Sequence, residues 1–211
     1  MTRFSPLLLG SFWLTMNTAN SQAELCTYQT WDWDTIHKKS VNHRKVTKQR
    51  TELTVEELGT VQGCSVCSED QSEIQIASLP PISVCHAMAH STKKALTEAA
   101  QRGFSIETLV GYRVGRSKGP INSEGLRTQF SNHSYGVAID INSEKNGLYH
   151  GCEQFGPQCR LIRGGEYHPN ALGSITRLSV LYKCLRAIGL KWGGEMTGDQ
   201  KDFMHFSHDG Q

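Results

Sequence analysis

The sequence has no marked excess of either charge: 22 basic residues stand against 20 acidic ones, a formal net charge of +2. Proteins that bind nucleic acid through its phosphates need a strongly cationic surface, so we expect no nucleic-acid partner. Beyond its first residues the chain has no apolar run long enough to span a bilayer, and we predict no transmembrane segment. Internal repeats and low-complexity tracts are also missing, so nothing indicates a repeat architecture.

The first 23 residues have the composition of a secretory signal peptide. Arg3 supplies a positive charge, an apolar stretch from Pro6 to Leu14 follows, and Ser21-Gln22-Ala23 offers the small residues that a signal peptidase reads. We therefore predict residues 1–23 to be a signal peptide and the protein to be exported, periplasmic or secreted. Cleavage after Ala23 removes one basic residue, Arg3, and no acidic one, which lowers the net charge from +2 to +1.

Export changes the interpretation of the seven cysteines, because thiols in an oxidising compartment are expected to form disulfides first. Cys152 and Cys159 flank a loop that contains glycine and proline, and we predict a disulfide between them. The odd number leaves one thiol free, which we expect to be Cys184, buried inside a helical pattern. The sequence does not determine the pairing of the other four, Cys26, Cys64, Cys67 and Cys85.

Two other roles for these four cysteines are less favoured. Cys64 and Cys67 have the spacing of half a zinc knuckle, but no second close pair follows at the required distance. Cys26 could carry a lipid, but Ala23-Glu24 before it is a poor lipidation signal. Disulfide bonding therefore stays the expectation for all four.

The chain after Ala23 divides in two by composition. Residues 24–81 are polar and irregular, and we interpret them as an N-terminal extension that packs on the main domain and has no chemistry of its own. Their cationic run over residues 38–50 is typical of the solvated face of a hairpin, with binding to an anionic wall polymer as the alternative. Thr54-Val55-Glu56-Glu57 has the form of a capping box and predicts a brief helix.

From residue 82 to 211 the pattern becomes regular. Residues 83–102 and 175–188 read as helices with a glycine after each. Alternating or short apolar runs predict strands at 104–110, 137–141, 190–192 and 202–206. A polar, glycine-rich loop is expected over residues 114–129. This order predicts an α+β fold, in which helices pack on one small antiparallel sheet.

The residues that carry chemistry lie at the ends of two predicted strands. His133 and Asp140 surround the start of one strand, and Asp202 and His205 lie near the end of the chain. Two imidazoles and a carboxylate, with one position left for water, are a catalytic ligand set for zinc. Asp202 would then be a spare carboxylate that can deprotonate the water. Residues three apart on a flat strand face opposite sides, so Asp202 shares a site with His205 only if the predicted strand 202–206 begins after Asp202 and Asp202 lies in the turn after Gly198.

These residues resemble a known family, the zinc D-alanyl-D-alanine peptidases and related peptidoglycan endopeptidases. Ser131 to Asp140 matches the family block Ser-x-His-x-x-Gly-x-Ala-x-Asp at every fixed position, and Asp202 to His205 matches Glu-or-Asp-x-x-His. Trp192-Gly193-Gly194 and Gly111-Tyr112-Arg113 resemble two further family elements. The resemblance covers residues 83–206 and is specific, because four elements occur in the right order.

The resemblance implies one Zn²⁺ per chain, held by His133, Asp140 and His205. Asp202 would be the general base, and Arg113 would stabilise the oxyanion or hold a substrate carboxylate, a task that suits the guanidinium fork. Ser131 would bind the substrate. The implied activity is zinc-dependent hydrolysis of peptide bonds in peptidoglycan stem peptides or cross-links, by a D,D-carboxypeptidase or an endopeptidase, and we expect a monomer.

Two alternatives compete with this interpretation. A non-catalytic zinc-containing module that binds the cell wall would have no use for Asp202 or Arg113, which counts against it. His86 and His90 lie four apart on a predicted helix, but without an adjacent glutamate we interpret them as surface residues. Residues 207–211 are predicted to be a frayed terminus.

Overall fold

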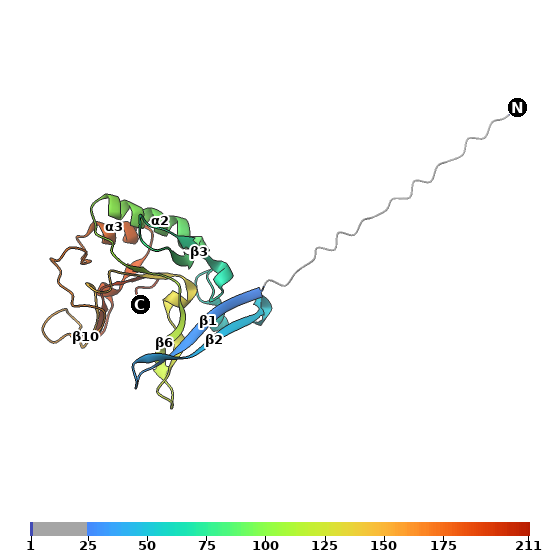
Figure 1. The fold of residues 1–211 in the computed structure, drawn as a ribbon, viewed down its shortest axis with the longest axis horizontal. Coiled ribbons are helices and arrows are strands. Elements are labelled where there is room, and N and C mark those ends of the chain that lie inside the picture. Colours follow the sequence, from blue (N-terminus) through green and yellow to red (C-terminus); the bar gives the residue numbers. More distant parts are fainter. Residues whose placement is uncertain (2–24) are drawn as a thin grey trace.

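The computed structural model describes Met1 and residues 25–211 (Figure 1). Apart from Met1, the predicted signal peptide lies outside the described residues, as does its cleavage site. Within the described part the chain is a mixed α+β structure with three α-helices and several small sheets. The α+β class is confirmed. The single small sheet is not, because the strands of this part divide among four sheets.

One antiparallel sheet, ordered β11-β13-β8-β5, contains the two strands with predicted metal ligands. Its strands are β5 (Leu109–Val110), β8 (Ala138–Ile141), β11 (Lys191–Trp192) and β13 (His205–Ser207). Ile139 of β8 pairs with Phe206 of β13, and both are buried in the main hydrophobic core. Side chains alternate between the faces of a strand, so Asp140 and His205 lie on the opposite face.

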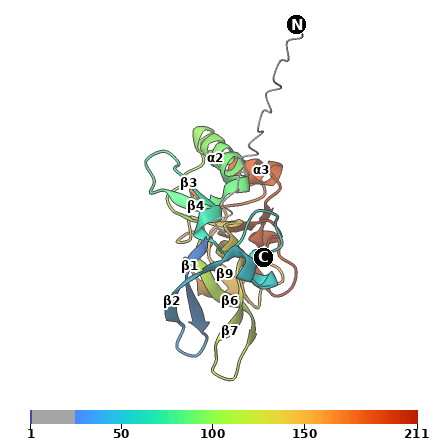
Figure 2. The same cartoon turned by 90° about the vertical axis from the view of Figure 1, so that its right-hand side faces the viewer.

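The helices α2 (His86–Gln101) and α3 (Val180–Ala187) pack on the core side of this sheet and lie together in both views (Figures 1 and 2). Both are shorter than predicted. Residues 82–85 form β4 (Ile82–Cys85), paired with β3 (Gln71–Ile74), and α3 begins only after Ser179, whose hydroxyl caps it. The apolar periodicity in front of each helix therefore reflects burial rather than helical structure.

A second four-stranded sheet contradicts the loop that we predicted over residues 114–129. This segment is a hairpin of β6 (Val114–Ile121) and β7 (Arg127–Phe130). Glycines, charged residues and two register shifts disturb the alternation by which a strand is recognised in sequence. β1 (Leu25–Asp34) pairs with β2 (Lys39–Gln49) and, in parallel, with β6. Figure 2 shows both hairpins projecting away from α2 and α3.

The parallel pairing of β1 with β6 puts residues from both sides of position 81 into one sheet. The division of the chain into residues 24–81 and 82–211 stays a prediction. The cationic run lies largely on β2, whose residues are all exposed or half-buried, and this confirms a solvated hairpin face. The remaining elements are α1 (Val55–Leu58), β9 (Leu148–His150), β10 (Arg160–Arg163) and β12 (Gln200–Asp202). β9 pairs with both β10 and β12.

Three disulfides connect the described cysteines. The predicted Cys152–Cys159 bond is present, and Cys184 is free and buried, as expected. The other two bonds are Cys26–Cys67 and Cys64–Cys85. The zinc-knuckle and lipidation alternatives are therefore wrong, because these sulfurs are bonded to each other. Three disulfides suit an oxidising compartment. None of the helices in the described residues is long and apolar enough to cross a membrane.

The predicted capping box at Thr54 is confirmed, and its glutamate has a second role. Glu57 is buried, accepts a hydrogen bond from the Thr54 amide at 2.8 Å, and forms an ion pair with Lys48 at 2.8 Å. The Tyr28 hydroxyl donates to the same carboxylate. Burial alone raises the pKa of Glu57, but the hydrogen bonds from Lys48, Tyr28 and Thr54 outweigh it and lower that pKa to about 2.

We expect this carboxylate to make the fold sensitive to acid. The folded-state pKa of Glu57 lies below the value of 4.5 for a free side chain. Its contribution to the free energy of unfolding is therefore fully present above about pH 4.5 and is lost as the pH falls towards 2. Glu57→Gln should lower the free energy of unfolding by about 3 kcal/mol at pH 7 and by much less near pH 2. Urea denaturation at a series of pH values measures this difference. Glu73→Gln, at an exposed position of β3, is the control, and an equal loss at every pH would contradict the prediction.

Candidate active site

The predicted metal ligands His133, Asp140 and His205 come together at one point. His133 lies in a short 3₁₀ helix, Asn132–Tyr135, and Asp140 lies on β8, directly opposite His205 of β13. Gly136 joins the 3₁₀ helix to β8 with φ of 66°, a left-handed conformation that glycine adopts without strain. A Cβ at this position would also lie 2.5 Å from the Cys85 amide nitrogen, so the chain needs a glycine here.

The three ligand atoms are close to one another and shielded from solvent. Asp140 Oδ1 lies 3.0 Å from His133 Nε2 and 2.9 Å from His205 Nδ1. The exposed fractions of the three residues are only 2% for His133, 6% for Asp140 and 5% for His205. This buried His/Asp/His group could hold a metal ion. In the described residues a second group, Cys26, Cys67 and Glu69, has similar spacing, but its cysteines form a disulfide and offer no thiolate.

The outer nitrogen of each imidazole is paired with a main-chain oxygen. His133 Nδ1 lies 2.8 Å from the Gly111 oxygen, and His205 Nε2 lies 3.0 Å from a Gln211 oxygen. An oxygen there can only accept, so each ring donates its N–H outward. With its proton on the outer nitrogen, each neutral ring would present its inner nitrogen, beside the Asp140 carboxylate, as a lone pair to a metal ion. Three electron-rich atoms in one buried place favour a cation between them, and outer partners of this kind are typical of metal-bound histidines.

The negative charge on Asp140 is consistent with a role as a ligand for a metal ion. Burial alone raises its pKa, but the charges and hydrogen bonds of His133 and His205 outweigh that effect and hold the pKa well below its usual range. Arg113 adds an ion pair, with Nη2 at 3.0 Å from Asp140 Oδ2. The carboxylate is therefore ionised and oriented, as a metal ligand must be.

Asp202 lies beside this group but on another sheet. It ends β12 rather than lying in a turn, and the turn Phe203-Met204 interrupts the strand that we predicted over residues 202–206. Asp202 therefore still precedes β13, the strand of His205, as its spacing requires. Burial, followed by the charge of Asp140, raises the pKa of Asp202 to about 6, although His205, Lys118 and Arg163 oppose the shift. Its Oδ1 atom is buried without a hydrogen-bond partner in the described part of the chain. A carboxylate oxygen that is buried without a partner destabilises the folded state, and a carboxylate with a raised pKa is typical of a catalytic group.

The Trp-Gly element that precedes Asp202 holds the turn in place. Trp192 is buried and donates from Nε1 to the Phe203 oxygen at 2.9 Å. A Cβ at Gly193 would lie 2.5 Å from the Asp202 carbonyl oxygen and 3.2 Å from the His205 Cβ. Only a residue without a side chain permits this approach, so Gly193 sets the position of both Asp202 and His205.

The other two predicted site residues also have unsatisfied polar atoms. Arg113 uses one end of its guanidinium on Asp140, and its Nε is buried without a partner among the described residues. The same holds for the Ser131 hydroxyl, which lies at the start of the 3₁₀ helix. Both groups lie next to predicted metal ligands, Arg113 through its ion pair and Ser131 two residues from His133.

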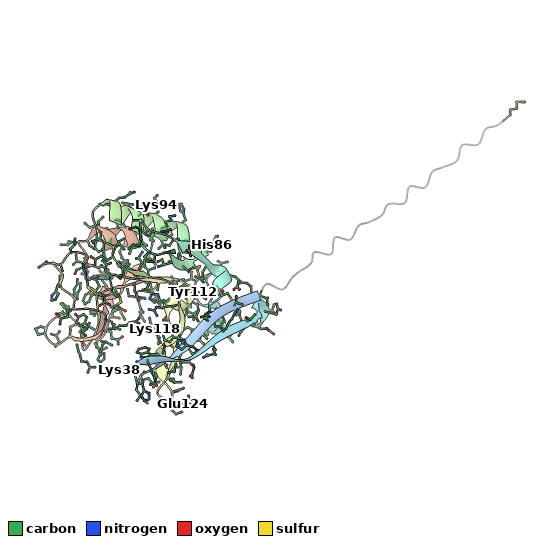
Figure 3. The ribbon with its side chains drawn as sticks, viewed as in Figure 1. Lys38, His86, Lys94, Tyr112, Lys118 and Glu124 are labelled. Carbon is green, nitrogen blue, oxygen red and sulfur yellow. A yellow bond between two sulfur atoms is a disulfide. The ribbon has the colours of Figure 1, made fainter. Side chains whose placement is uncertain are left out.

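Sequence reasoning missed Lys118. It lies on β6, beside the centre of the molecule (Figure 3), in the segment that we predicted to be a loop. Burial lowers the pKa of its ammonium group, whose charge interacts with Asp209, Asp202 and Asp140. If residues 114–121 had been predicted as a strand, Lys118 could have been placed near the site.

A groove of about 510 Å³ reaches the site at Arg113. Most of its lining comes from β1 and from the residues around Arg113. The lining residues are Thr27, Tyr28, Gln29, Trp31, Lys45, Ser68, Tyr112, Arg113 and Val114. Of the segment that we predicted to be a loop, residues 114–129, only Val114 is among the lining residues, and none of them comes from the loop between Cys152 and Cys159.

Comparison with known families agrees with this geometry. Residues 125–208 match the model of a family described as D-alanyl-D-alanine carboxypeptidase, which confirms the predicted resemblance. The match contains Ser131, His133, Asp140, Asp202 and His205, and it begins after Arg113. It supports a hydrolase of the peptidase class with a peptidoglycan-derived substrate. No curated protein and no solved structure gives a match to the chain.

Proposed function

We propose that the chain is an exported zinc metallopeptidase of peptidoglycan stem peptides or cross-links, a proposal supported by the match of residues 125–208 to the D-alanyl-D-alanine carboxypeptidase family model. One observation carries the proposal: the buried group of His133, Asp140 and His205 lies beside the unsatisfied carboxylate of Asp202. A metal-binding module without catalysis has no need for an unsatisfied carboxylate at that place. The three disulfides and the composition of residues 1–23 support export.

The ligand atoms fit zinc. Two imidazole nitrogens and one carboxylate oxygen, each with an outer partner, are a common set in zinc hydrolases and leave an open coordination position. When bound, zinc polarises the scissile carbonyl and makes the attacking water more acidic. We assign one Zn²⁺ per chain to His133, Asp140 and His205.

The chain's own residues supply the rest of the reaction. Asp202 accepts the proton of the attacking water and passes it to the leaving amine, a transfer that suits a carboxylate whose pKa is about 6. Arg113 holds Asp140 with one end of its guanidinium and directs its remaining donors to the developing oxyanion or to a substrate carboxylate. Ser131 offers its free hydroxyl to the substrate.

Digestion of purified muropeptides with the zinc-loaded protein, followed by mass spectrometry, tests this function. Loss of a terminal alanine identifies a D,D-carboxypeptidase, whereas separated cross-links or a severed stem identify an endopeptidase. If the loaded protein binds the muropeptides and releases nothing, the proposal is wrong and a non-catalytic wall-binding module is favoured.

Gly193→Ala should impair this site from a distance. The added methyl group would displace the Asp202 carbonyl and press on the His205 Cβ, and a shift of about 1 Å at a catalytic group can cost about 100-fold in rate. We expect kcat for muropeptide hydrolysis to fall at least tenfold in a folded protein. Gly156→Ala is the matched control, because its Cβ would meet only the flexible side chain of Gln158. Equal rates for the two variants would count against the role of Gly193.

A further inference from the structure

The last described segment, Ser207–Gln211, is not the frayed terminus that we predicted. In the view of Figure 1 the C-terminal end lies over the middle of the fold rather than projecting from its edge. The Ser207 hydroxyl donates to Asp209 Oδ1 at 3.1 Å and accepts from the Gly210 amide at 2.9 Å. The Gln211 amide donates to the same Asp209 oxygen at 2.9 Å. Ser207 and Gly210 are buried, so the segment forms a closed and ordered turn.

This turn contacts both elements that carry imidazole ligands. A main-chain oxygen of Gln211 accepts from His205 Nε2 at 3.0 Å. Asn132, the neighbour of His133, donates from Nδ2 to Asp209 Oδ1 at 2.6 Å and also to the Gln211 oxygen. The turn therefore bridges the 3₁₀ helix of His133 and the strand of His205, which lie 72 residues apart in the chain.

We propose that Ser207–Gln211 is a clasp that positions the metal site, with Gln211 holding the tautomer and orientation of His205 and Asp209 linking the turn to Asn132. His205 can present Nδ1 to a metal only while its proton is on Nε2. The Gln211 oxygen is the partner for that proton. Removal of an outer partner of a metal-bound histidine costs about 10–100-fold in metal affinity. None of the five clasp residues contacts the substrate in this role, so they are positioning residues.

The clasp rests on the metal-binding part of the proposed function, and the test is chosen to separate the two. Zinc affinity is measured by competition with a chelator for the wild type, for a chain that lacks residues 208–211, and for Asp209→Ala. His208→Ala is the matched control, because His208 is exposed in the same segment and its side chain makes none of these contacts. The absorption spectrum of bound Co²⁺ reports the ligand geometry in each variant.

We expect the deletion to weaken zinc binding about 10–100-fold, Asp209→Ala to weaken it less, and His208→Ala to leave it unchanged. The Co²⁺ spectrum should change in the first two variants only. A segment with a merely structural role would lower the melting temperature of the zinc-free protein and leave the zinc affinity within twofold of wild type, which would overturn the clasp alone. A wild type that binds no zinc would refute both the clasp and the proposed function.

Discussion

Asp202→Asn is expected to lower kcat for muropeptide hydrolysis by about 10²–10⁴-fold and to leave zinc affinity unchanged. Asparagine has nearly the same shape as aspartate but cannot accept the proton of the attacking water. The zinc affinity should persist because Asp202 belongs to a different strand from the three ligands and is not among them. Steady-state kinetics and chelator competition on the same protein sample measure the two quantities.

Asp199→Asn is the control for this variant. Asp199 is an exposed carboxylate three residues earlier in the chain, paired at the surface with His150. We expect its replacement to leave kcat within a factor of about two, since surface ion pairs contribute little. Unchanged hydrolysis in Asp202→Asn would show that the base has been assigned wrongly, and a loss of zinc in that variant would show that Asp202 is a ligand.

The pH dependence of kcat tests the role of the Asp202 carboxylate independently. A general base works only when deprotonated, so kcat falls as the pH drops through its pKa. Burial raises the pKa of Asp202 to about 6, and a bound cation nearby lowers it. The acidic limb of the wild-type profile should therefore lie at or below about pH 6, and the residual rate of Asp202→Asn should lack that limb.

His133→Ala is expected to raise the zinc dissociation constant by more than about 100-fold and to abolish hydrolysis. Loss of the hydrogen-bond partner of a metal-bound histidine alone lowers metal affinity by up to about 100-fold. His133→Ala removes the ligand atom itself, Nε2, which lies 3.0 Å from Asp140 Oδ1. It also leaves the Asp140 carboxylate buried with one fewer partner, so circular dichroism must accompany the zinc measurement.

His90→Ala is the matched control for the ligand variant. His90 is exposed on α2 and belongs to the His86/His90 pair that we interpreted as surface residues. Its replacement should change neither zinc affinity nor rate. If His90→Ala weakened zinc binding as strongly as His133→Ala, the metal would have to bind elsewhere.

The meeting of His133, Asp140 and His205 could be predicted from sequence because these residues lie in short, specific blocks. The block from Ser131 to Asp140 fixes the local path of the chain, and Gly136 shows why: its left-handed conformation and its close contact with the Cys85 amide exclude other residues. The Cys152–Cys159 bond was predictable for the same reason, since it closes a short loop.

Features that depend on pairing between distant segments could not be predicted. β6 and β7 have glycines and register shifts that remove the alternating pattern, so Lys118 was placed in a loop. The parallel pairing of β1 with β6 joins segments that are about 84 residues apart (Thr30 with Val114), and no local signal reports it. The clasp at residues 207–211 is built from main-chain atoms and from Asn132, a position that the family block leaves variable.

We propose that one zinc ion in the His133–Asp140–His205 group makes the chain a peptidase. Titration of the zinc-free protein with zinc, while peptide release from muropeptides is followed, tests it most directly. We predict no release without zinc and a rate that rises in proportion to added zinc and levels off at one equivalent per chain. Release by the zinc-free protein, or a chain saturated with zinc that releases no peptide, would contradict the account.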